Sequence, residues 1–121
     1  MKRVKFNPEI FLEISKKLRD NTALNEIGRF MTSINRAYYA AFLIIRTRLE
    51  LKGKSFKKEA QHKEIRDYLK DLNHDFLATE LETLFSYRVN ADYILKTEIN
   101  KALCKKCILL SETVIESVEE I

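Results

Sequence analysis

Residues 37–45 read AYYAAFLII, and this run decides the fold. It lies inside a longer stretch, residues 27–49, in which apolar side chains recur at the spacing of an α-helix. Gly53 follows this stretch, and glycine commonly ends a helix. We therefore expect a long helix at the centre of the molecule.

The run is apolar around its whole circumference, which is unusual for a surface helix of a small protein. One side can face the core, but Tyr39, Leu43 and Arg46 point elsewhere and need another cover. A helix that is buried on both sides in so short a chain predicts contact with a second subunit. We therefore expect a homodimer.

The same apolar period predicts further helices before and after the central one. We expect them at about residues 8–19, 59–72 and 76–95, with a last helix that starts at Thr97 and Glu98. Asn7 and Pro8 provide an N-cap and a first helical residue for the earliest of them. The predicted fold is all-α, a four- to five-helix up-and-down bundle with short loops.

Length and composition agree with this prediction. The 121 residues suit one domain, residues 1–121, and are enough to bury a core without disulfides. Two Gly, one Pro and 45% hydrophobic residues favour an ordered helical protein. No apolar run approaches the roughly 20 residues of a membrane span, and the N-terminus lacks a signal-peptide core. We expect a cytoplasmic protein that does not associate with a membrane.

Charge is distributed unevenly along the chain. Residues 1–58 hold 14 Lys and Arg against 5 Asp and Glu, a net charge of +9, while residues 59–121 hold 8 against 13, a net charge of −5. A basic half suits RNA, an acidic partner protein or the acidic half of a second copy. The charge pattern by itself does not choose among these partners.

Cys104 and Cys107 have CxxC spacing, which is found in zinc sites and in redox motifs. A structural zinc site needs four ligands, and His62 and His74 do not form a second close pair. A redox motif is expected near a βαβ pattern, which this sequence lacks. We expect two reduced thiols, no bound metal and no cofactor.

The stretch FSYRVNADYIL, residues 85–95, puts a charge where an apolar stripe should continue. The stripe consists of Leu77, Leu81, Leu84 and Phe85. Arg88 and Asp92 are next in the series, and burying either one unpaired would cost several kcal/mol. They either form a buried pair, lie at the end of the core, or line a cleft in which Arg88 holds a phosphate through its planar guanidinium.

Further polar candidates lie near these residues or on the central helix. Asn90 projects from the same turn as Arg88, and Tyr93 follows shortly after. Arg36 and Tyr39 are three positions apart on the central helix, although core or interface packing is the more common explanation for a tyrosine there. His62 is one of two histidines that could move protons near neutral pH. No Ser–His–Asp, Cys–His or paired-carboxylate arrangement can be assembled by spacing.

Three motifs resemble those of the HEPN domain family. They are RAYYAAF at 36–42, QHKEI at 61–65 and RVNADY at 88–93. The chain is most similar to small stand-alone HEPN proteins with an R-A-Y-Y-A-x-F helix and an R-x-x-A-D-Y helix, and the resemblance covers nearly all of it. It implies an all-helical bundle that usually dimerises and a role in RNA or nucleotide biology.

The resemblance also implies site residues. Many HEPN proteins are metal-independent endoribonucleases whose motif is an arginine followed a few residues later by a histidine, and they leave 2′,3′-cyclic phosphate ends. Arg88 matches the motif arginine and Asn90 a polar residue inside the motif, but Tyr93 follows where a histidine would be expected. His62 resembles a histidine of this sub-branch and is a candidate to replace the missing base.

In that interpretation three residues are catalytic. Arg88 would stabilise the phosphorane charge, His62 would take or give the proton, and Tyr93 would position the RNA or act as an acid. The residues expected to contact the substrate are Asn90, Asp92, Arg36 and Tyr39.

Two functions from different classes follow. The first is a dimeric metal-independent endoribonuclease or toxin component of a toxin–antitoxin or defence system. The second is a non-catalytic module that binds a nucleotide or docks a minimal nucleotidyltransferase, as the missing histidine suggests. A helical domain that only dimerises is a third, simpler interpretation. The sequence alone leaves open whether the protein is an enzyme.

Overall fold

The computed structural model describes residues 7–57, 61–90 and 99–121. These residues form five α-helices and a final 3₁₀ turn. In chain order they are α1 (Glu9–Asp20), α2 (Glu26–Leu51), α3 (Gln61–Asp71), α4 (Asp75–Val89), α5 (Lys101–Ser117) and η3 (Val118–Glu120). The all-α prediction is therefore confirmed.

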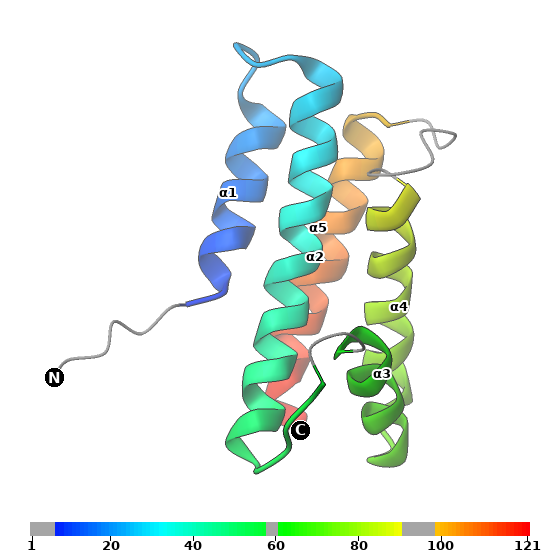
Figure 1. Ribbon diagram of the computed structural model, residues 1–121. Coiled ribbons are helices and arrows are strands. Elements are labelled where there is room, and N and C mark those ends of the chain that lie inside the picture. The colour runs from blue at the N-terminus through cyan, green and yellow to red at the C-terminus, as the bar shows by residue number, and fades with distance from the viewer. Residues whose placement is uncertain (1–6, 58–60, 91–98) are drawn as a thin grey trace, which may run out of the picture.

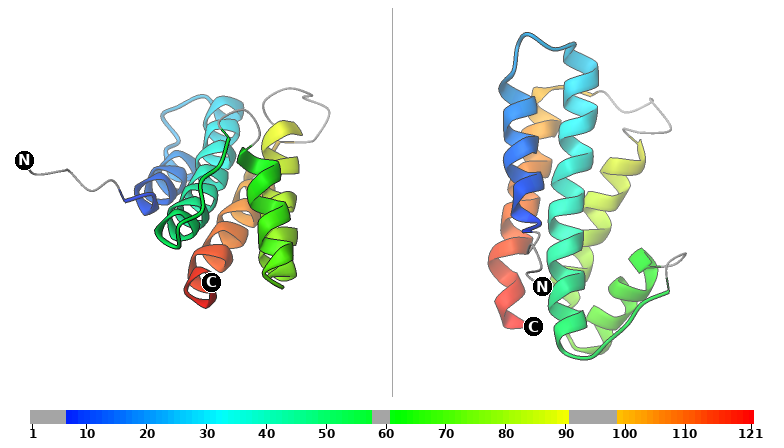
Figure 2. Two further views of the ribbon diagram at one scale, coloured as in Figure 1. Left: turned by 60° about the horizontal axis from the view of Figure 1, so that its bottom comes forward. Right: turned by 60° about the vertical axis from the view of Figure 1, so that its left-hand side comes forward.

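The helices form an up-and-down bundle (Figure 1). The four long helices α1, α2, α4 and α5 run side by side and alternate in direction. The short α3 follows α2 and precedes α4 in the chain, and it lies at one end of the bundle. Two further views show the same arrangement, with α3 inclined to the long helices (Figure 2). The predicted topology is thus present, with α3 as the fifth, smaller element.

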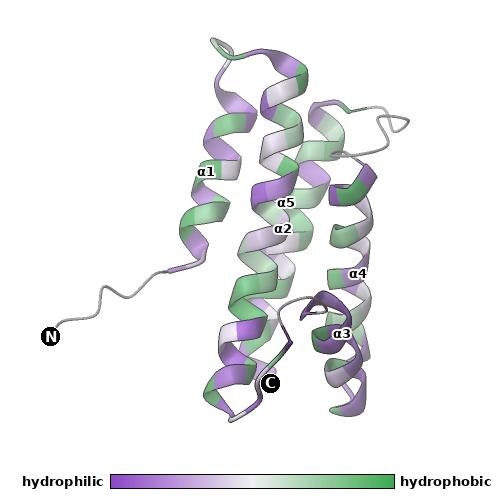
Figure 3. Cartoon of the chain, viewed as in Figure 1, coloured by the Kyte–Doolittle hydropathy of each residue, from purple (hydrophilic) through white to green (hydrophobic). Residues whose placement is uncertain are grey.

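The long central helix α2 organises the core, as its sequence predicts. It has 26 residues, about 39 Å of helix, and it contacts each of the other four helices. Ten of its residues are buried: Phe30, Ser33, Ile34, Ala37, Tyr38, Ala40, Ala41, Phe42, Ile45 and Leu49. Apolar and polar segments alternate along the other long helices, whereas α3 is mostly hydrophilic (Figure 3).

Asparagines begin three of the helices by accepting hydrogen bonds from otherwise unpaired backbone amides. Their side-chain oxygens bind the N–H of Glu9 at 3.0 Å (from Asn7), of Gly28 at 3.0 Å (from Asn25) and of Leu103 at 2.9 Å (from Asn100). The predicted start of the first helix at Asn7 and Pro8 is correct within one residue.

Two helices end in a left-handed residue. Gly53 after α2 has φ 94° and Asn73 after α3 has φ 64°. The amide that follows each one turns back to a helix carbonyl, Lys54 N–H to Leu49 at 3.2 Å and His74 N–H to Leu69 at 2.8 Å. Hydrogen bonds of this kind satisfy carbonyls at a helix C-terminus. The turn at Asn73 makes the connection between α3 and α4 short.

Two expected helix boundaries, the start of the last helix and the end of α4, fall on residues outside the described ranges. The last helix does not include Ile99 or Asn100: Asn100 is extended, with φ −144° and ψ 177°, and caps a helix that begins at Lys101. The predicted start at Thr97 and Glu98 is therefore wrong as the start of α5, and those two residues lie outside the described ranges. The predicted extension of α4 from Ala91 to Leu95 also lies outside them.

Among the described residues, no helix combines the length and apolar character that a membrane crossing needs.

Candidate functional site

Arg88 continues the apolar stripe of α4 because its guanidinium packs on aromatic rings. The carbon at the centre of the guanidinium lies 5.1 Å from the ring centre of Tyr39, 5.4 Å from that of Tyr38 and 5.9 Å from that of Phe85. Guanidinium groups are attracted to the faces of such rings within about 6 Å. Arg88 is half-buried as a residue, and its Nε is a buried atom.

Tyr39 lies between two arginines. The guanidinium of Arg36 is 5.2 Å from its ring centre and also lies 5.0 Å from the ring of Phe11 on α1. Arg88 approaches the same tyrosine from α4. Arg36 also donates a short hydrogen bond to the side chain of Asn35. The structure therefore brings together Arg36, Tyr39 and Arg88, three predicted site residues, from α2 and α4.

His62, at the start of α3, is hydrogen-bonded through both ring nitrogens. Its Nδ1 is 2.7 Å from the Tyr38 hydroxyl on α2, and its Nε2 is 3.0 Å from a carboxylate oxygen of Glu82 on α4. Arg66 donates to the same Glu82 oxygen at 3.1 Å. The imidazole also stacks on Phe85, with ring centres 3.8 Å apart. His62 thus lies beside α4, the helix that carries Arg88.

The electrostatics of this network favour a neutral imidazole. Burial lowers the pKa of His62, and the hydrogen bond and charge of Glu82 oppose that effect only in part. Burial raises the pKa of the Tyr38 hydroxyl well above its usual value. Burial would also raise the pKa of Glu82, but hydrogen bonds from His62 and Arg66 bring it below its ordinary value. A neutral imidazole with a carboxylate at Nε2 carries its proton there, so Nδ1 accepts a hydrogen bond from Tyr38.

The other predicted site residues are placed as follows. Asn90 is the C-cap of α4, and its backbone N–H donates to the carbonyls of Ser86 and Tyr87. It is half-buried. Asp92 and Tyr93 lie outside the described residues, so their predicted roles stay predictions.

Sequence reasoning missed Glu82, Arg66 and Phe85, and it treated Tyr38 only as a packing residue. Tyr38 and Phe85 connect His62 to Arg88, and Glu82 and Arg66 extend the contacts on the other side of His62. An available signal was the acidic Glu82, which lies one position after Leu81 of the apolar stripe. Its pairing with an imidazole from another helix is a tertiary contact that helical periodicity does not encode.

The two cysteines are buried on α5 as free thiols. The Sγ of Cys104 donates to the Ser33 hydroxyl at 2.8 Å. Within residues 7–57, 61–90 and 99–121, the structure has no cluster of three or more side chains suited to holding a metal ion. Both thiols belong to the hydrophobic core.

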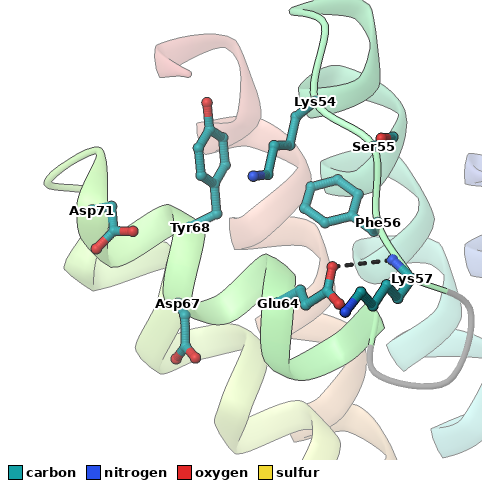
Figure 4. A pocket seen from close by; sticks show the side chains of 8 residues that line it. All are labelled: Lys54, Ser55, Phe56, Lys57, Glu64, Asp67, Tyr68 and Asp71. Atoms are coloured by element: carbon teal, nitrogen blue, oxygen red, sulfur yellow. Dashed lines mark hydrogen bonds between the residues drawn. The ribbon is translucent and has the colours of Figure 1, made fainter.

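A pocket of about 580 Å³ lies between the connection after α2 and the outer face of α3 (Figure 4). It is lined by Lys54, Ser55, Phe56, Lys57, Glu64, Asp67, Tyr68 and Asp71. The ammonium of Lys54 already covers the ring of Tyr68 at 4.9 Å, and Phe56 meets that ring edge-on. Two lysines and three carboxylates give this pocket charges of both signs, unlike the arginines around Tyr39.

Comparison with known protein families agrees with this geometry. The model of the HEPN domain family matches residues 10–121, which include α2, α3 and α4 with the residues described above. No curated protein matches the chain. Because the family model covers almost the whole chain, the protein belongs to the HEPN domain family.

Proposed function

We propose that this HEPN protein binds the phosphate of RNA or of a nucleotide through Arg88, on a surface shared with Arg36 and Tyr39, and that it acts as a homodimer. The observation that carries this proposal is the placement of two guanidinium groups within 5.2 Å of one tyrosine ring. HEPN domains in general are associated with nucleotide binding or with ribonuclease activity and commonly dimerise.

The physical basis is charge and shape together. Two guanidinium groups packed on one ring offer cationic hydrogen-bond donors to a phosphate near a single aromatic residue. Guanidinium groups bind phosphate oxygens in a planar, two-point geometry. Single-stranded RNA is commonly bound by basic and aromatic side chains that lie together.

A second candidate function is metal-independent RNA cleavage, as in a toxin of a toxin–antitoxin or defence system. The observation in its favour is that neutral His62 stacks on Phe85, and the Arg88 guanidinium lies 5.9 Å from the same ring. In this reaction the RNA 2′-hydroxyl attacks the adjacent phosphorus and the bond to the 5′-oxygen breaks. His62 would take or give a proton, Arg88 would stabilise the phosphorane, and Tyr93 would position the RNA or act as an acid.

The contacts of His62 place binding ahead of cleavage. A general base must have a free nitrogen within hydrogen-bond reach of the proton that it removes. Both nitrogens of His62 already have partners, Tyr38 and Glu82, so cleavage would require one of these hydrogen bonds to open.

One experiment separates the two functions. Labelled single-stranded RNA, and separately ATP, are titrated with wild-type protein, Arg88→Ala and the control Arg19→Ala, which removes an arginine paired with Asp20 on α1. Binding that is lost in Arg88→Ala and kept in Arg19→Ala supports the proposal. Equal binding by all three proteins, or none by the wild type, contradicts it.

The same RNA is then incubated in EDTA and the product ends are analysed. Products with 2′,3′-cyclic phosphate ends that disappear in Arg88→Ala would establish the endoribonuclease. Their presence at unchanged yield in His62→Ala would exclude His62 as the base. Intact RNA, from a preparation that binds it, would leave the protein a binding module.

The homodimer has its own test. Tyr39 on α2 is half-buried in the subunit, and we propose that the partner subunit covers this part of α2. Wild type should sediment as a dimer at micromolar concentration, and Tyr39→Glu should sediment as a monomer with unchanged circular dichroism. A monomeric wild type would contradict the dimer. A minimal nucleotidyltransferase remains a proposed partner, to be tested by co-purification with the wild type.

A further inference from the structure

A continuous series of side-chain contacts links the surface of α3 to Arg88. Arg66 and His62 both bind the same oxygen of Glu82, at 3.1 and 3.0 Å. His62 binds the hydroxyl of Tyr38 at 2.7 Å. The ring of Tyr38 in turn lies 5.4 Å from the Arg88 guanidinium. Each member touches the next, and the series crosses three helices.

The series fixes the ring against which Arg88 packs. Tyr38 is 2% exposed, and its hydroxyl is directed at Nδ1 of His62. His62 is held in turn by Glu82 at its other nitrogen and by the stacked ring of Phe85. The carboxylate of Glu82 selects the imidazole form that carries its proton on Nε2. Only that neutral form leaves Nδ1 able to accept from Tyr38.

We propose that Glu82 and Tyr38 are positioning residues that act through His62 to hold the Arg88 guanidinium in its phosphate-binding orientation. This role rests on the proposed phosphate binding at Arg88. An arginine that is ordered before the ligand arrives loses less conformational freedom on binding. Removing the hydroxyl of Tyr38 or the carboxylate of Glu82 breaks a hydrogen bond that holds the Tyr38 ring in place, and it leaves the Arg88 side chain itself unchanged.

The first test measures the order of Arg88 directly and needs no ligand. The heteronuclear NOE of the Arg88 Nε–Hε group is recorded in ¹⁵N-labelled full-length protein and assigned with Arg88→Lys. We expect a value close to that of the backbone in wild type. It should fall below the wild-type value in Glu82→Ala and in Tyr38→Phe.

Two variants serve as controls. Glu82→Gln keeps an oxygen that can accept from His62 Nε2, so it should restore the order of Arg88. Glu80→Ala removes a carboxylate two positions away on α4 for which the described part of the chain shows no hydrogen bond or salt bridge, and Arg88 should stay ordered. Tyr38→Phe keeps the buried ring and decides the outcome if Glu82→Ala does not fold. An ordered Arg88 in Tyr38→Phe would overturn the positioning role.

The second test is the affinity of the same variants for labelled single-stranded RNA and for ATP. Ordering one long side chain on binding costs roughly 0.5–1.5 kcal/mol, which corresponds to a two- to tenfold loss of affinity in Tyr38→Phe and Glu82→Ala. If a variant has a lower NOE for Arg88 but binds with unchanged affinity, the order of the Arg88 side chain does not contribute to binding. If wild type binds neither probe, the proposed function fails, and the NOE still decides whether Glu82 and Tyr38 position Arg88.

Discussion

The side chains of Ser15 and Ser33 each donate a hydrogen bond to the backbone carbonyl of the other, both at 2.7 Å. Their hydroxyl oxygens are also 2.9 Å apart, and both residues are fully buried. The exchange joins α1 to α2 through buried polar groups. Cys104 of α5 adds a third helix by donating to the Ser33 hydroxyl.

Ser33→Ala should therefore lower the free energy of unfolding by about 1–3 kcal/mol, since it leaves buried partners without their hydrogen bonds. The measurement is urea denaturation followed by circular dichroism. Ser86→Ala, at an exposed serine of α4, should change stability by no more than about 0.5 kcal/mol. Equal effects of the two substitutions would contradict a structural role for the serine pair.

The two glycines should respond to alanine in opposite directions. Gly53 has φ 94°, where a side chain is strained, so Gly53→Ala should cost about 1 kcal/mol. Gly28 lies in the first turn of α2, and an added Cβ would make only ordinary contact, 3.5 Å from Asn25 Oδ1. Gly28→Ala should stabilise the protein by about 0.5 kcal/mol. Thermal unfolding of both variants beside wild type tests the contrast, and a shift of the same sign in both would refute it.

The stability of the fold should depend on His62 in weakly acidic solution. Its pKa is lowered on folding from an ordinary value of 6.5, so the unfolded chain binds more protons just below that pH. The free energy of unfolding should therefore fall as the pH decreases from about 6.5 toward 5. In His62→Gln, denaturation midpoints measured over this interval should fall less steeply. Parallel curves for the two proteins would rule out His62 as the source.

Cys104 and Cys107 should resist thiol reagents in the native protein. Burial raises the pKa of both thiols, that of Cys107 to about 12. Because the thiolate is the reactive form, a thiol with such a pKa has on the order of a thousandfold less thiolate at pH 8 than an ordinary cysteine. Ellman's reagent should detect almost no thiol in buffer and two per chain in guanidinium chloride. Rapid labelling of the native protein would show that the thiols are accessible.

The helices could be predicted because the chain repeats one simple pattern. Apolar residues at helical spacing locate α2 almost to the residue, and Asn7 with Pro8 marks the start of α1. The start of α5 was misplaced because Thr97 and Glu98 have the composition of a helix start, as does Asn100. Three such residues within four positions compete for the cap, and only the backbone geometry shows that Asn100 takes it.

The site was predicted only in part. Arg88 was recognised because a charge interrupts an apolar stripe, and Arg36 and Tyr39 because they lie beside the motif on α2. The contacts that surround them are between helices far apart in sequence, such as Tyr38 with His62 and His62 with Glu82. Such contacts depend on how α3 packs across α2 and α4, which no local spacing specifies.

The small size of α3 has a consequence for motion in the native state. This helix buries only Ile65 and Leu69, and it packs mainly on α4, with little contact to α2. Segments with so few buried contacts open at a lower free energy than the whole protein does. The amide hydrogens of α3 should therefore exchange with solvent before those of α2, while the four long helices stay intact. Each such opening would carry His62 away from Tyr38 and release the ring beneath Arg88.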